Sequence, residues 1–234
     1  RNENPNRTGL AHLMEHLMFT GSKNAPDFDD VVQMAGGENN AFTDEDITNY
    51  YMTLPACNVE TALWIEADRM HALTLSDESI EVQRKVVIEE FNQRCLNQPY
   101  GDLAHLKCAL AFKEHPYRWP VIGKEVSHIA DASREEILDF YNTHYAPDNA
   151  VLVVAGNVDP EQIFAMSEKW FGDINRKATR IPIAAEPAQT AQRFLEVERD
   201  VPADTVQMMY HMGSRLSRDY YVMDIATDIL ADGV

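Results

Sequence analysis

The sequence predicts an α+β protein in which an antiparallel sheet packs against helices. Apolar residues recur at helical spacing in several segments, most clearly over 59–73. Residues 40–54 are instead rich in Thr, Tyr and Phe, a composition typical of strands. The 234 residues are 45% hydrophobic and 25% charged, which is the composition of a globular protein and excludes wholesale disorder.

Helices are expected where apolar spacing or start and stop residues frame a segment. Thr8 is the candidate cap of the first helix, Gly36-Gly37 ends the second, and Pro160 lies near the start of a later one. Residues 98–131 show a mixed pattern and no clear element. The helices expected from these signals are 8–18, 27–35, 59–73, 79–97, 134–145 and 160–171.

Strands are expected in three places. Residues 40–54 form a hairpin or two strands around the acidic tip Asp44-Glu45-Asp46. Residues 150–158, AVLVVAGNV, are almost entirely apolar, which is typical of a buried strand that ends in a Gly-Asn turn. Residues 193–212 alternate like a strand pair around Pro202.

The composition changes near residue 180. Residues 175–192 contain two prolines and many Ala, Thr and Gln residues, which predicts a linker at 181–192. We therefore expect a complete domain over 1–180, a linker, and the start of a second domain over 193–234. The apolar helical pattern after residue 220 reaches the stop signal Gly233, so we also expect a fragment of a longer polypeptide.

Charge and cysteine content exclude several classes of partner and structure. Acidic residues outnumber basic ones by 38 to 20, so the formal net charge is −18, which disfavours nucleic acid or an anionic lipid surface as the main partner. A solvated acidic surface accounts for this charge, and it would also attract basic peptides. No apolar stretch is long enough for a membrane span. The three cysteines are too scattered for a disulfide framework.

The most informative segment for chemistry is GLAHLMEH, residues 9–16. On a helix, His12 and His16 lie one turn apart on the same face, so both imidazoles can reach one metal ion. Glu15 lies beside that face, where a carboxylate can accept a proton from activated water. The order HxxEH is the inverse of the zincin motif HExxH. The flanking Leu and Met residues would half-bury these groups, and burying them without a function costs free energy.

A catalytic zinc ion needs a third protein ligand and an open coordination position. The candidates lie in residues 83–94, where Glu89 and Glu90 are adjacent. On a helix their side chains point about 100° apart, so only one of them can face the site. The neighbouring apolar residues do not decide between the two.

Four segments follow one another along nearly the whole chain: GLAHLMEHLMFTGSKN (9–24), GGENNAFTDEDITNYY (36–51), RKVVIEE (84–90) and NAVLVVAGNV (149–158). Together they resemble the pitrilysin/insulinase family of zinc metallopeptidases, inverzincins that include the mitochondrial processing peptidases. The resemblance implies the family's metallopeptidase domain, of LuxS-like type, for the first domain, without its first strand. It implies that the second, truncated domain is homologous to the first.

The resemblance also implies roles for individual residues. His12, His16 and Glu90 correspond to the family's zinc ligands, with one zinc ion per chain, and Glu15 corresponds to its general base. Gln83 replaces the Glu that the family usually has seven residues before its zinc-binding Glu. A Gln keeps the hydrogen-bonding shape but not the charge, so we expect altered tuning of the site from a position just outside the ligands, and no loss of zinc.

The segment Asn40-Ala41-Phe42-Thr43 matches the family's substrate-side edge strand. An extended peptide would pair with the exposed backbone of such a strand and lay its scissile carbonyl over the metal. These four residues are therefore expected to bind substrate, mainly through their backbone groups.

The implied function is hydrolysis of peptide bonds in extended peptides by zinc-activated water. The alternative is a non-catalytic structural or substrate-presenting subunit of the same family, which the change at Gln83 favours and the intact motif disfavours. A different zinc hydrolase or lyase fits the flanking segments less well. The family draws further catalytic groups from a C-terminal half, so that half, or a partner subunit, is expected. A soluble protein of the bacterial periplasm or cytoplasm is expected, with the compartment left open.

Overall fold

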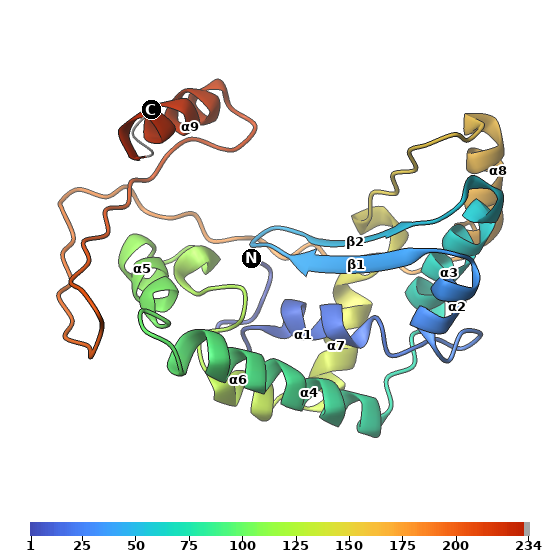
Figure 1. Ribbon diagram of the computed structural model, residues 1–234, viewed down its shortest axis with the longest axis horizontal. Helices are drawn as coiled ribbons and strands as arrows, with labels where there is room; N and C mark the ends of the chain where they lie inside the picture. Colours follow the sequence, from blue (N-terminus) through green and yellow to red (C-terminus); the bar gives the residue numbers. More distant parts are fainter. Residues whose placement is uncertain (232–234) are drawn as a thin grey trace.

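The structure is a computed structural model that describes residues 1–231. Helix α1 lies between a two-stranded antiparallel sheet on one side and helix α4 on the other (Figure 1). The expected α+β class, with an antiparallel sheet packed against helices, is confirmed. The elements are α1 Leu10–Leu17, α2 Phe28–Met34, β1 Glu38–Thr43, β2 Thr48–Thr53, α3 Val59–Ala72, α4 Asp77–Phe91, α5 Leu103–Ala111, α6 Val126–Ala130, α7 Arg134–His144, α8 Pro160–Phe171 and α9 Arg218–Ala231.

Helix α1 forms the centre of the main hydrophobic core. Its apolar residues recur at positions i, i+3, i+4 and i+7, and this stripe is buried against α4, α6 and α7. Residues from all four helices make up this core: Leu10, Leu13, Met14, Leu17, Ile80, Val87, Ile129, Ile137 and Tyr141. The two histidines of the motif lie outside this stripe, on the side of α1 that Glu90 of α4 approaches.

The expectation that Thr8 caps α1 is wrong. Gly9 is the N-cap, in the left-handed conformation at φ 86°, and a Cβ atom there would lie 2.8 Å from the Ile122 carbonyl oxygen. The Glu3 carboxylate accepts hydrogen bonds from the backbone N–H groups of Gly9 and Ala11, at 3.0 and 2.9 Å. The first N–H groups of α1 are therefore capped by a carboxylate from outside the helix, and not by the hydroxyl of the adjacent Thr8. The Thr8 hydroxyl instead accepts a hydrogen bond from Lys124 N–H.

The expected hairpin is confirmed as β1 and β2, with Glu38 opposite Thr53 and Thr43 opposite Thr48. Exposure alternates along β1, so Asn39, Ala41 and Thr43 share a half-buried face while the residues between them are exposed. Within residues 1–231, β1 pairs with β2 alone, and its other edge is free.

The helix expected over 79–97 begins earlier and ends less regularly. Ser76 and Ser79 form a capping box that starts α4 at Asp77. After Phe91 the chain continues as a π-helical turn over Asn92–Leu96. The other five expected helices are confirmed within one or two residues, whereas α5 and α6 were not predicted.

Two of the three strand predictions are wrong. Residues 150–158 and 193–212 form no strand, and no segment within the described chain pairs with either of them. Val151 and Val153 are 89% and 78% exposed, which contradicts the expected burial. An apolar or an alternating sequence is suited to a strand. The strand forms only where the backbone of a neighbouring segment supplies hydrogen bonds.

Residues beyond α8 are mostly exposed up to helix α9, which lies away from α1 and the hairpin (Figure 1). Helix α9 agrees with the helical pattern expected after residue 220, while the stop signal Gly233 lies outside the described residues. No helix in the described part of the chain has the length and apolar character needed to cross a membrane.

One carboxylate attaches the segment 181–192 to the rest of the protein. Glu186 accepts hydrogen bonds from the backbone N–H groups of Lys113, Glu114 and His115, at 2.9 to 3.0 Å. Burial opposes the ionisation of Glu186, but these donors and Arg193 outweigh burial and lower its pKa to about 2.

Replacing Glu186 with Gln is expected to speed cleavage of residues 181–192 by a broad-specificity protease at neutral pH, because a neutral amide accepts hydrogen bonds more weakly. Because the pKa is lowered, the contact of wild-type Glu186 is fully present above its ordinary pKa of 4.5 and is lost as the pH falls through about 2. Replacing the exposed Glu196 with Gln is the control. Equal cleavage rates in wild type and both variants would show that the contact does not hold the segment.

Candidate metal centre

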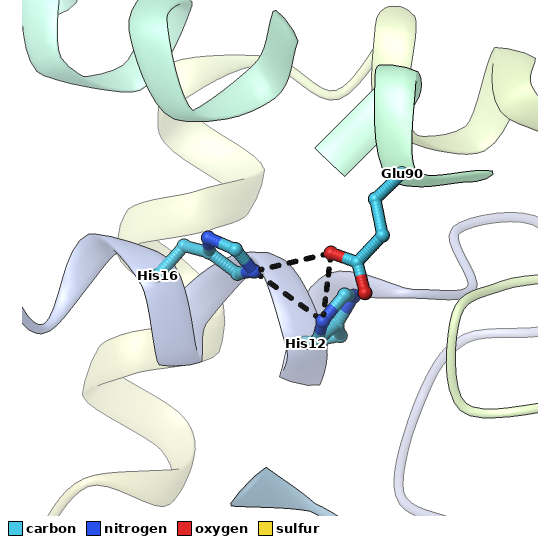
Figure 2. Close-up of side chains that lie close together, drawn as sticks. All are labelled: His12, His16 and Glu90. Carbon is cyan, nitrogen blue, oxygen red and sulfur yellow. Dashed lines mark hydrogen bonds and ion pairs between the residues drawn. The ribbon is translucent and has the colours of Figure 1, made fainter. Parts of the chain in front are cut away.

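Three side chains from two helices meet at one point. His12 and His16 project from α1, and Glu90 reaches toward them from α4 (Figure 2). The two Nε2 atoms are 3.3 Å apart, and Glu90 Oε2 lies 3.6 Å from each of them. They form a group of possible metal ligands within the described residues. The structure thus brings together the three residues expected to bind zinc.

These distances fit a tetrahedral zinc ion. Zinc–nitrogen and zinc–oxygen bonds of about 2.0 to 2.2 Å place neighbouring ligands of a tetrahedron about 3.3 to 3.6 Å apart. The three separations in the structure fall in that range. Two imidazole nitrogens that face each other can share only one proton, whereas a cation can accept a lone pair from both. The donor set of two nitrogens and one carboxylate oxygen suits zinc and leaves one position open.

Burial favours the form of His12 that can bind a metal ion. Burial lowers the pKa of His12, partly offset by the negative charge of Glu90, so the neutral imidazole that binds metals is favoured. The His12 side chain is 11% exposed, whereas those of Glu90 and His16 are 20% and 24% exposed. The site is therefore reached from solvent on the side of His16 and Glu90.

The orientation of Glu90 is held by an ion pair with Arg94 of the π-helical turn that follows α4. Arg94, one turn later, lies 2.9 Å from Glu90 Oε1, which leaves Oε2 to face the histidines. Glu89 is exposed and accepts a hydrogen bond from Gln93 at 2.9 Å, so it points elsewhere. Sequence reasoning did not single out Arg94, although an opposite charge four residues after a candidate ligand was a visible signal.

Glu15 is half-buried on α1, and its Oε2 accepts a hydrogen bond from the hydroxyl of Thr43 on β1. Two phenols lie nearby, with the hydroxyls of Tyr50 and Tyr145 2.8 Å apart. Burial raises the pKa of Tyr145 to about 12 and raises that of Tyr50 well above 10, and the charge of Glu15 acts in the same direction. Both phenols therefore stay protonated at neutral pH.

The remaining predicted residues lie on α4 and on strand β1. Gln83 is half-buried on α4, two turns or about 10.5 Å along the axis from Glu90, and none of the hydrogen bonds described for residues 1–231 joins it to the three ligands. Asn40 and Phe42 are on the exposed face of β1, whereas Ala41 and Thr43 are on its half-buried face.

Comparisons with known proteins identify the family of the chain. Residues 1–119 match the model of "Insulinase (Peptidase family M16)", and residues 131–234 match "Peptidase M16 inactive domain". The zinc protease PqqE of Helicobacter pylori is 33% identical over 239 residues, which cover 100% of this chain and 54% of the relative. An uncharacterized zinc protease of Bacillus subtilis, YmxG, is 29% identical over 180 residues, or 76% of this chain and 43% of that protein.

Solved structures give the same result for the fold. A crystal structure of a protease from Helicobacter pylori matches with a TM-score of 0.77 and 34% identity, over 82% of this chain and 48% of that one. The periplasmic protease PqqL of Escherichia coli matches with a TM-score of 0.70 and 21% identity, over 80% of this chain and 22% of that one, and shows the fold alone. The chain thus spans about half the length of the curated relatives it matches. It belongs to the insulinase family of peptidases, peptidase family M16.

Proposed function

We propose that this chain is the zinc-binding part of a metalloendopeptidase that hydrolyses extended peptides. The observation that supports this most strongly is the set of separations among His12, His16 and Glu90, which matches the edges of a zinc tetrahedron. One zinc ion per chain would be held by these three side chains. When bound, zinc supplies Lewis-acid chemistry, which acidifies water and polarises the peptide carbonyl.

Glu15 is the general base in this proposal. It accepts the proton of the attacking water and returns that proton to the amine that leaves when the peptide bond breaks. Its place beside His16 on α1 keeps it close to the ligands without making it one of them. The Thr43 hydrogen bond occupies Oε2, and none is described for Oε1 within residues 1–231.

The substrate is proposed to bind along the free edge of β1 as an added strand. The backbone groups of Asn40-Ala41-Phe42-Thr43 would pair with an extended peptide, and peptides of many sequences can bind in this way. The acidic character of the chain favours basic peptides.

The chain is proposed to act together with a second half. Residues 1–180 would form the zinc-binding domain, 181–192 a linker, and 193–234 the beginning of a homologous domain. The relatives are about twice as long, which supports a partner half in the same polypeptide or in another subunit.

A non-catalytic subunit is the second candidate. The match of residues 131–234 to a domain described as inactive favours it, as does Gln83. The presence of His12, Glu15, His16 and Glu90 in one chain favours the enzyme, since a scaffold has no need of the general base.

The experiment that separates the two candidates is cleavage of a mixture of unstructured basic peptides, followed by mass spectrometry. We expect cleavage by the zinc-loaded protein with its partner half present, loss of cleavage after chelation, and recovery when zinc is restored. Bound zinc without any cleavage would support the non-catalytic subunit.

A further inference from the structure

Thr43 is the residue through which the hairpin contacts the motif helix. It is the last residue of β1, and its hydroxyl donates a hydrogen bond to Glu15 Oε2. Thr48, its cross-strand partner on β2, has its own hydroxyl oxygen 3.3 Å from that of Thr43. Thr43 thus sits between the candidate base and a second hydroxyl group on the neighbouring strand.

The orientation of Thr43 distinguishes it from the other residues of the predicted substrate strand. Asn40 and Phe42 are exposed, and Phe42 retains 46% of its accessible surface. Thr43 lies on the half-buried face, where its hydroxyl is committed to Glu15. A side chain bonded to the base cannot at the same time point outward to a substrate side chain.

We propose that Thr43 is a positioning residue for Glu15, a role that rests on the proposed peptidase function. A glutamate side chain has three rotatable bonds, and a carboxylate that must take a proton from water works only in a narrow range of positions. The Thr43 hydrogen bond fixes one carboxylate oxygen and leaves the other to accept the proton. This hydrogen bond from the hairpin, and not the helix that bears Glu15, therefore sets the direction of the base.

The test replaces Thr43 with Val and with Ser in the zinc-loaded protein assayed with its partner half. Val keeps the shape and the strand preference of Thr but removes the hydroxyl, whereas Ser keeps the hydroxyl. For Thr43→Val we expect kcat to fall by about 10- to 100-fold with KM within about twofold of wild type. Zinc affinity, measured by competition with a chromophoric chelator, should not change, and Thr43→Ser should recover most of kcat.

Thr53→Val is the matched control, because Thr53 lies at the opposite end of the same hairpin and is exposed. Unchanged kcat in Thr43→Val would overturn the proposal. So would a rise in KM at constant kcat, which identifies a substrate subsite, or a Ser variant as impaired as the Val variant at full zinc content. Glu15→Gln, measured in parallel, separates the two failures: if it hydrolyses peptides like wild type, Glu15 is not the base and the proposed mechanism is wrong, whereas an inactive Glu15→Gln beside an unaffected Thr43→Val overturns only the role of Thr43.

Discussion

Replacement of Glu15 with Gln is expected to abolish peptide hydrolysis while zinc binding is retained. Gln has the shape of Glu but no basic oxygen, so it cannot take a proton from water. General base catalysis contributes about 10²- to 10⁴-fold, and kcat should fall by at least that range. The measurement combines a peptide cleavage assay with the zinc content of the same preparation.

The matched control for this variant is Glu161→Gln, at an exposed position of α8 outside the site. That variant should hydrolyse peptides like wild type. Hydrolysis retained in Glu15→Gln would remove Glu15 from the role of base. Loss of zinc from Glu15→Gln would instead mean that this carboxylate is needed to hold the metal.

Replacement of Glu90 with Ala is expected to remove zinc from the protein. This variant loses one of the three proposed ligands. Residues that only hydrogen-bond to a metal ligand typically contribute about 10- to 100-fold to metal affinity, so removal of a ligand itself should lower the zinc affinity by more than about 100-fold. The ion pair with Arg94 is lost as well, but Arg94 is largely exposed, so folding should be little affected. Elemental analysis after dialysis measures the effect.

The adjacent residue supplies the control. Glu89→Ala removes the same side chain one position earlier, where it is exposed and bonded to Gln93. It should keep about one zinc per chain. The opposite pattern, with zinc kept in Glu90→Ala and lost in Glu89→Ala, would exchange the two assignments.

Sequence reasoning succeeded where local interactions decide the structure. The spacing of His12 and His16 is a property of one helix, and the helix forms from its own apolar stripe. The choice between Glu89 and Glu90 was different, because it depends on how α4 packs against α1, which helical geometry alone does not give. The resemblance to known peptidases favoured Glu90, and the structure places that side chain opposite the histidines.

The predictions that were wrong concern structure that depends on residues outside the segment from which the prediction was made. Residues 150–158 have the composition of a buried strand, but pairing depends on a partner distant in sequence, and the described chain supplies none. The cap of α1 comes from Glu3, six residues before the N-cap Gly9, so a rule based on the adjacent hydroxyl chose Thr8. Thr43 was expected at the substrate strand, and no local pattern linked its hydroxyl to Glu15.

The most direct test of the metal centre is zinc K-edge X-ray absorption on the zinc-loaded protein. For zinc held by His12, His16 and Glu90 we expect only nitrogen and oxygen neighbours at about 2.0 to 2.2 Å, with the outer scattering of two imidazole rings. Replacing His16 with Ala should reduce that outer scattering to one ring or remove the zinc. Sulfur neighbours at about 2.3 Å, or two imidazole rings that persist in the His16 variant, would show that zinc binds elsewhere and would contradict the account.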